Sequence, residues 1–229
     1  MGKLLNGSID YRALRAHFFG DYTVLPERYS PEDQRLSRVR GVQVILQYLD
    51  VFHGVDYLNR VLRRLQLCGI MFDDLEKYVS PLVGIDILNN LEKDGFCSEQ
   101  IKDIGKMTFT VSQSDLGKSL SAQKSPKALY EYLHEALPPY YDMLFQYKLE
   151  RLAKYGCTVR VIPRAESQDR FCTHAIGDRA LCLYKQGVYA SFLANLNGQY
   201  AEVSESDCLY KGAAFCRYNI SWNSAVLLH

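Results

Sequence analysis

Apolar residues recur at helical spacing through the first half of the chain. Between residues 42 and 67 they fall three or four positions apart until His53-Gly54 interrupts them, so this segment predicts two consecutive helices. Ser80-Pro81 and Ser125-Pro126 each place a capping serine before a proline, which is typical of helix starts. The first of these two helices is expected to end at Gly95. The N-terminal part of the chain is therefore predicted to be helical.

The second half of the chain mixes helical and strand patterns. Pro138-Pro139 is predicted to end the preceding helix, and a further helix is expected over Tyr140–Tyr155, capped by Gly156. Residues 157–163, CTVRVIP, alternate in the way a half-buried strand does. The last predicted elements are a helix over Ile176–Leu196 and strands over Tyr200–Ser204 and Phe215–Trp222. This order predicts an α+β fold, with a helical lead-in and dimerisation region over 1–100 and a ligand-binding domain over 101–229.

Composition and charge exclude several classes of protein. The 229 residues are 48% hydrophobic and 23% charged, which is the composition of a folded globular protein. A formal net charge of +1 gives no electrostatic reason to expect nucleic acid or an anionic membrane as a partner. No apolar run reaches the roughly 18 residues of a membrane span, and the first residues do not form a signal peptide. We expect a cytoplasmic protein, in which seven cysteines serve for metal binding or packing instead of disulfides.

Two cysteines near the C-terminus flank a loop that contains Gly212. Cys208 and Cys216 can converge across this loop, but tetrahedral Zn²⁺ takes four ligands. Further ligand types nearby are Glu202, Glu205, Asp207 and, on the preceding predicted helix, Cys182. From these residues alone, both a metal site and simple burial of the thiols remain open. Cys172 and His174 offer a different ligand pair or an ordinary loop, and Cys68, Cys97 and Cys157 are interpreted as packing residues.

The segment Gly177–Trp222, with its ending CLYKGAAFCRY, resembles the C-terminal half of the 4-vinyl reductase domain family. In that family, the sensor domains of bacterial phenol-responsive activators hold zinc with three cysteines and one glutamate. The intervals between those four ligands match the intervals here, so the resemblance implies a structural zinc on Cys182, Glu205, Cys208 and Cys216. Asp207 competes with Glu205 for the carboxylate role. Because Asp207 is adjacent to Cys208 in an extended segment, its side chain is expected to point to the opposite side. The resemblance also relates the fold to haem nitric-oxide sensors and to vesicle-tethering (TRAPP-type) subunits.

Aromatic residues in the second half suggest where a ligand binds. Tyr130 and His134 share a helical face, and aromatic residues continue beyond it. An aromatic-rich core explains the same residues, and the resemblance favours a pocket for a small apolar or aromatic molecule. The candidate ligand-binding residues are Tyr130, His134, Tyr141, Phe145 and Phe171. Two family signatures are missing: the tryptophan expected of a phenol pocket, because Trp222 follows the last zinc ligand, and the Tyr-x-Ser-x-Arg signature of haem sensors.

The sequence contains no catalytic constellation, phosphate-binding loop or dinucleotide fingerprint, so we do not expect an enzyme. We expect the ligand-sensing input domain of a bacterial signalling or transcription-regulatory protein, with structural zinc. It would act as a homodimer and make no direct contact with nucleic acid or membrane. The alternatives are a scaffold that dimerises through the apolar helix faces of 42–67 and 82–91 without a ligand, and a tetrapyrrole vinyl reductase-like enzyme.

Overall fold

The computed structural model describes residues 25–110, 115–141 and 143–223; within these ranges the side chains at 70, 109–110, 115–116, 136–141 and 197 are left out of the description. The N-terminal elements are β1 (Ser37–Arg38), α2 (Val39–His53), α3 (Val55–Arg64), β2 (Tyr78–Val79) and α4 (Leu82–Lys93). The central helices are α5 (Ser98–Thr110), α6 (Asp115–Ser121) and α7 (Pro126–Tyr141). The C-terminal elements are β3 (Phe145–Ala153), β4 (Gly156–Pro163), α8 (Ala165–Phe171), α9 (Arg179–Phe192), α10 (Ala194–Asn197), β5 (Glu202–Asp207) and β6 (Cys216–Ser221). Short 3₁₀ turns lie at Glu27–Tyr29, Glu32–Gln34, Gly69–Phe72 and Leu209–Lys211.

The N-terminal layer forms as the apolar spacing predicts. The chain breaks between α2 and α3 at Gly54, whose φ of +82° suits a residue without a side chain. The helix predicted after Ser80-Pro81 begins at Leu82 and ends at Lys93, just before Gly95. The apolar faces of α2 and α4 are buried within the chain's own core, so the described chain does not present them as a free dimer interface. The buried residues of those faces include Val42, Ile45, Leu49, Ile85, Leu88 and Leu91.

The helix predicted over Tyr140–Tyr155 is wrong. Helix α7 continues past Pro138-Pro139 to Tyr141, and residues 145–153 form strand β3. The reason is visible in the strand itself, where Phe145, Tyr147 and Leu149 alternate with the exposed Gln146 and Lys148. This period of two places one face on the core and the other in solvent, which a helix cannot do with the same residues.

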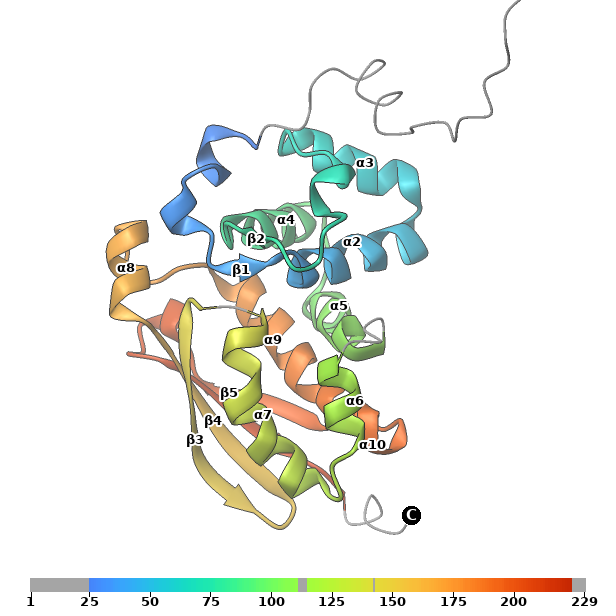
Figure 1. The fold of residues 1–229 in the computed structure, drawn as a ribbon, viewed down its shortest axis with the longest axis vertical. Helices are drawn as coiled ribbons and strands as arrows, with labels where there is room; N and C mark the ends of the chain where they lie inside the picture. Colours follow the sequence, from blue (N-terminus) through green and yellow to red (C-terminus); the bar gives the residue numbers. More distant parts are fainter. Residues whose placement is uncertain (1–24, 111–114, 142, 224–229) are drawn as a thin grey trace, which may run out of the picture.

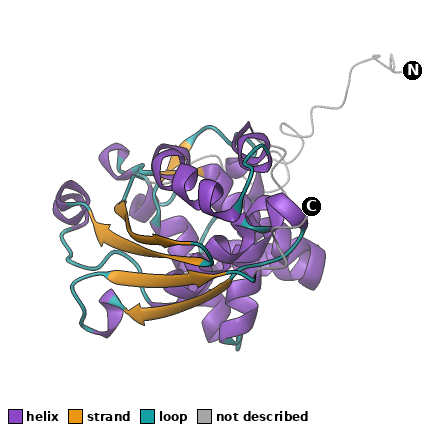
Figure 2. Cartoon of the chain, turned by 90° about the horizontal axis from the view of Figure 1, so that it is seen from below, coloured by secondary structure: helices purple, strands orange, loops and turns teal. Residues whose placement is uncertain are grey.

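The C-terminal sheet has four antiparallel strands in the order β3-β4-β6-β5, and with the helices it confirms the predicted α+β fold. Strand β4 matches the predicted CTVRVIP segment, and its alternate residues Cys157, Val159 and Val161 are buried. Helices α7 and α9 pack on this sheet, and Figure 2 shows its four strands beside the helical body. The sheet therefore supplies one wall of the core and the helices the other.

Helix α9 connects the two parts of the molecule. Figure 1 shows it running between the N-terminal helices and the sheet. Its Ala180 and Leu183 belong to the hydrophobic cluster of α2 and α4, whereas its Tyr189 and Phe192 belong to the cluster formed with the sheet. One helix thus contributes to both clusters. The boundary between 1–100 and 101–229 stays a prediction.

Two glycines let α9 lie directly against α5. A Cβ atom on Gly187 would lie 1.9 Å from the Lys102 carbonyl oxygen, and one on Gly105 would lie 2.1 Å from the Tyr184 carbonyl oxygen. Backbone meets backbone at this crossing, so no side chain can move aside to make room. The crossing fixes α9, and with it every functional side chain that the helix carries.

Candidate metal centre and ligand cavity

Four side chains from three elements meet at one end of the sheet. Cys182 lies in the first turns of α9, Glu205 lies on β5, Cys208 follows β5, and Cys216 begins β6. Helix α9 begins after Asp178, which caps it. The Asp178 side chain accepts hydrogen bonds from the backbone N–H groups of Ala180, at 2.9 Å, and Leu181, at 3.4 Å. The cap and the hairpin together bring the four groups into one place.

The ligand atoms of these four residues all lie within 4.8 Å of one another. The Cys182 sulfur lies 3.8 Å from that of Cys208 and 3.4 Å from that of Cys216. One carboxylate oxygen of Glu205, Oε1, is buried and has no hydrogen-bond partner among the described residues. Burying such an oxygen is costly unless a donor or a cation compensates for it. Three thiols and one carboxylate are a donor set suited to tetrahedral zinc.

The thiols of this cluster do not share one acidity. The Cys182 thiol donates toward Cys216, which lowers the pKa of Cys216 to about 7 and raises the pKa of Cys182. The backbone N–H of Leu209, 3.4 Å from the Cys216 sulfur, also favours the thiolate. Burial raises the pKa of Cys208. The polypeptide alone thus favours the deprotonated form of one thiol, Cys216. A bound cation would be needed to keep all three cysteines of the cluster as thiolates.

The competing ligands lie elsewhere. The Asp207 carboxylate accepts a hydrogen bond of 2.6 Å from Arg217 and takes no part in the thiol cluster. Cys172 and His174 are exposed. Of the three cysteines interpreted as packing residues, Cys157 is buried and Cys68 is partly buried, but Cys97 is exposed, so that interpretation of Cys97 is wrong.

A cavity of about 110 Å³ lies between the N-terminal layer, α9 and the beginning of β3. Most of its wall is aliphatic or aromatic and comes from α2, α4, α9 and the start of β3. Representative residues of this wall are Val42, Ile45, Leu88, Leu144, Phe145 and Val188. An apolar cavity of about 150 Å³ holds benzene, so this smaller one, of about 110 Å³, is suited to a small molecule with at most one ring.

The polar side chains of the cavity wall include two cations and several hydroxyl groups. Lys185 on α9 is buried, and its ammonium nitrogen lies 3.3 Å from the centroid of the Phe145 ring and 3.5 Å from the Tyr147 hydroxyl. Arg38 also lines the cavity and is hydrogen-bonded to Glu76, an exposed residue outside the lining. Thr108 on α5 also lines the cavity, and its buried hydroxyl has no hydrogen-bond partner among the described residues.

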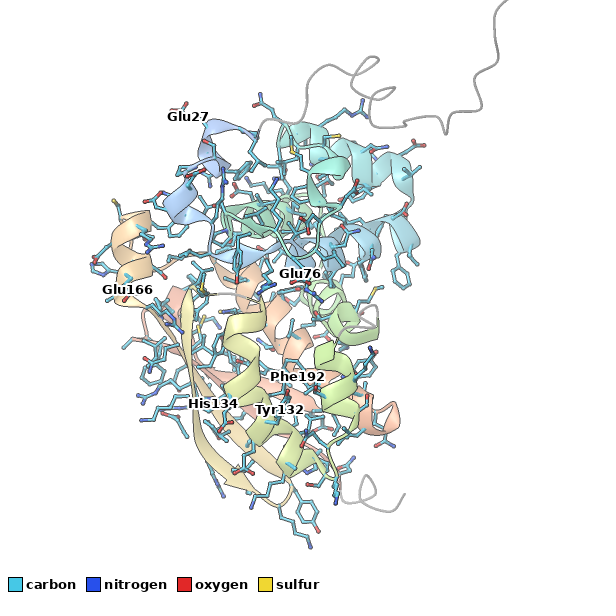
Figure 3. All side chains as sticks on the ribbon, in the orientation of Figure 1. Glu27, Glu76, Tyr132, His134, Glu166 and Phe192 are labelled. Atoms are coloured by element: carbon cyan, nitrogen blue, oxygen red, sulfur yellow. The ribbon has the colours of Figure 1, made fainter. Side chains whose placement is uncertain are left out.

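Of the predicted ligand-binding residues, Phe145 lines this cavity. Tyr130 is buried in the sheet core, where its hydroxyl donates to the Tyr189 carbonyl at 2.8 Å and its ring stacks on Trp222. His134 lies one turn farther along α7, and Figure 3 shows it well separated from Glu76, the residue that pairs with Arg38 of the cavity wall. The buried Nδ1 atom of His134 has no hydrogen-bond partner among the described residues. Phe171 is partly buried against the sheet core, and the side chain of Tyr141 is outside the described residues. A ligand role for these four residues stays a prediction.

Sequence reasoning missed most of the cavity wall. Lys185 offered a weak signal, because it is one of two cationic residues, with Arg179, in the largely apolar segment 176–196. Arg38 and Thr108 come from separate elements, and no spacing in the sequence relates them to Lys185. Only the crossing of α5, α9 and the N-terminal layer brings these residues to one cavity.

No family model matches the sequence, and no curated protein matches it. Solved structures of H-NOX proteins do match the fold. A variant of the H-NOX protein from K. algicida, in an Fe(II) unliganded state, has a TM-score of 0.61 at 13% identity, covering 82% of this chain and 97% of that one. A variant of an H-NOX protein from S. oneidensis gives 0.56 at 14% identity, with 82% and 96% covered. A variant named Tt H-NOX gives 0.55 at 14% identity, with 82% and 95% covered.

A haem does not fit the cavity described here. Pockets for drug-sized ligands begin at about 300 Å³, and haem is larger than most such ligands, whereas this cavity measures about 110 Å³. Haem iron is usually held by a histidine, cysteine or methionine, and in some proteins by a tyrosine; of these residue types, the described lining contains only tyrosines. In the part of the chain that the structure describes, no helix combines the length and hydropathy needed to cross a membrane. The chain thus has an α+β fold similar to that of H-NOX proteins, and it contains an apolar cavity and a cluster of three cysteines and one glutamate.

Proposed function

We propose that this chain is the ligand-sensing input domain of a bacterial signalling or transcription-regulatory protein. The observation that carries the proposal is the apolar cavity between the N-terminal layer and the sheet, because it is lined by both parts of the molecule. A molecule that fills the cavity would contact α2, α4 and α9 together. Its binding free energy would then favour one arrangement of these elements over others, which is the physical basis of a sensor.

The thiol cluster is proposed to hold a structural zinc. Cys182, Glu205, Cys208 and Cys216 would supply all four ligands, so no position would remain for a catalytic water. The metal would compensate the buried Glu205 oxygen and the closely spaced sulfurs, and would join the start of α9 to the β5–β6 hairpin. This joins the helix that lines the cavity to the sheet, and so keeps the cavity walls in place.

Binding of one-ring probes tests the sensing function. Toluene, benzyl alcohol and benzoate are added to the purified chain while its thermal unfolding midpoint is measured. A ligand at 100 times its Kd stabilises a protein by about 2.7 kcal/mol, which raises the midpoint by roughly 5–10 °C for a chain of this size. We expect at least one probe to produce such a shift.

The matched variant is Gly84→Leu. Gly84 lines the cavity, and a Cβ atom there would lie 3.7 Å from Ile45, in ordinary contact, so the added side chain takes up cavity space without a backbone clash. We expect it to weaken probe binding at least about tenfold. Asn59→Leu, at an exposed position of α3, is the control and leaves binding unchanged. If no probe binds the original chain and no small molecule copurifies with it, the sensing proposal is wrong.

A further inference from the structure

Tyr218 lies beside the ligands of the thiol cluster. It follows Cys216 by two positions on β6, so the two side chains share one face of the strand. On the neighbouring strand β5, Tyr218 pairs directly with Glu205, and opposite residues of an antiparallel pair have their side chains on the same face. The Cys182 sulfur on α9 lies over this face, 3.4 Å from that of Cys216. Ligands of the cluster therefore lie next to Tyr218 along its own strand, across the sheet and on the helix above it.

The hydroxyl of Tyr218 is buried without a hydrogen bond of normal geometry. The residue is 0% exposed, and its hydroxyl has no hydrogen-bond partner among the described residues. Its ring packs against the ring of Tyr189, with the centroids 5.2 Å apart, which keeps the hydroxyl in the core. Removing a hydroxyl from water without giving it a partner is costly. A buried polar group of this kind calls for an acceptor, and the thiol cluster is next to it.

The Cys182 sulfur is the acceptor within reach of this hydroxyl. The pKa of Cys182 is raised by its donation to Cys216 and by burial, and the Tyr218 hydroxyl acts in the opposite sense, as a donor to the sulfur does. As a thiol, Cys182 is a weak acceptor. As a metal-bound thiolate it would be a strong one, because hydrogen bonds to an ionised acceptor are about twice as strong as neutral ones. The hydroxyl would thus gain a full partner when a metal binds.

We infer that Tyr218 is a positioning residue of the metal centre, whose hydroxyl donates a hydrogen bond to the Cys182 sulfur and strengthens metal binding. The inference rests on the proposed structural zinc and adds a residue that does not touch the metal. Three thiolates and one carboxylate carry more negative charge than a divalent ion balances, so a donor to one sulfur offsets part of the excess. Hydrogen-bonding partners of metal ligands typically change metal affinity by about 10–100-fold.

Zinc affinity, measured on the purified chain by competition with a chromophoric chelator at neutral pH, tests the inference. Tyr218→Phe keeps the buried ring and removes the hydroxyl, and we expect it to weaken zinc binding about tenfold. Removing an unpartnered hydroxyl does not by itself destabilise a core, so a purely structural role predicts no such loss. Tyr200→Phe, which loses the same group at a position 46% exposed, is the matched control and leaves the affinity unchanged.

Cobalt in place of zinc gives a second measurement on the same variants. The thiolate-to-cobalt charge-transfer absorption depends on the electron density at the sulfurs, and loss of a hydrogen bond to one sulfur raises that density. We expect the band of Tyr218→Phe to keep its intensity, because all the ligands remain, and to move to longer wavelength. An unchanged zinc affinity or an unshifted band overturns the inference and leaves the structural zinc in place. If the original chain binds neither metal, both are wrong.

Discussion

The crossing of α5 and α9 makes a strong prediction about stability. Replacing Gly187 by alanine adds one methyl group that would lie 1.9 Å from the Lys102 carbonyl oxygen. Real Cβ atoms essentially never come closer than 3.0 Å to such an atom, and ordinary contact begins near 3.4 Å, so the Cβ atom and the carbonyl oxygen must move apart by about 1.1–1.5 Å. The three nearest atoms, from Lys102 and Lys106, are all backbone atoms, so no rotamer change can relieve the contact. Gly187→Ala is therefore an overpacking substitution at the centre of the molecule.

The expected cost follows from two opposing terms. Overpacking a well-packed core costs about 1–3 kcal/mol and occasionally more, and the backbone clash places this site at the upper end. Alanine in place of glycine in a helix returns about 0.5–1 kcal/mol. We expect a net loss of about 2–3 kcal/mol, which lowers the unfolding midpoint by roughly 4–12 °C for a chain of this length.

The control is Gly41→Ala on α2. A Cβ atom at Gly41 meets nothing within 4 Å, so only the helix-propensity gain applies and the variant should be more stable by about 0.5–1 kcal/mol. Urea unfolding followed by circular dichroism measures both variants. Gly105→Ala should resemble Gly187→Ala, and the double variant should cost less than the two single losses together because the helices are already apart. If Gly187→Ala proves as stable as Gly41→Ala, the described crossing is wrong.

Three further predictions concern α9, the sheet surface and the thiol cluster. Asp178→Ala removes the N-cap of α9 and should cost about 1 kcal/mol in urea unfolding; an unchanged midpoint would contradict the capping role. The hydrogen bond from Arg217 holds the pKa of Glu150 below its ordinary value of 4.5, so the stability that this carboxylate contributes is present at neutral pH and lost as pH falls through the folded-state pKa. The stability difference between the original chain and Glu150→Gln should therefore shrink in acid, and a difference that grows in acid would refute this. Cys208→Ser should lower zinc content and melting temperature together, whereas Cys172→Ser, at an exposed thiol outside the cluster, should change neither; full zinc retention in Cys208→Ser would exclude it as a ligand.

Much of the fold could be predicted from local patterns. Ser80-Pro81, the Gly54 break and the alternation of 157–163 each depend on a few neighbouring residues, and each gave the right element. Strand β3 was missed because tyrosines and leucines near Pro138-Pro139 satisfy a helical period over one or two turns. Its pairing with β4, from Phe145 opposite Pro163 to Ala153 opposite Gly156, decides the outcome through contacts that a single segment does not contain.

The candidate site divides in the same way. The four-residue cluster was found through intervals that match a family pattern, and the structure brings those residues together. Glu205 was preferred to Asp207 as the carboxylate ligand because adjacent side chains in extended backbone point to opposite sides. In the structure, the Asp207 carboxylate accepts a hydrogen bond from Arg217. The cavity could not be predicted, because Thr108 and Lys185 line it together only through the crossing of α5 and α9, where two glycines let the helices touch. The cytoplasmic location and the homodimer stay predictions.

The most direct test of the account is the metal itself. Zinc K-edge X-ray absorption, with elemental analysis, on protein purified without chelators should give one zinc per chain. We expect three sulfur neighbours at about 2.3 Å and one oxygen at about 2.0–2.2 Å. Protein that carries no zinc, or zinc surrounded only by nitrogen and oxygen, would contradict the proposed joining of α9 to the sheet through Cys182, Glu205, Cys208 and Cys216.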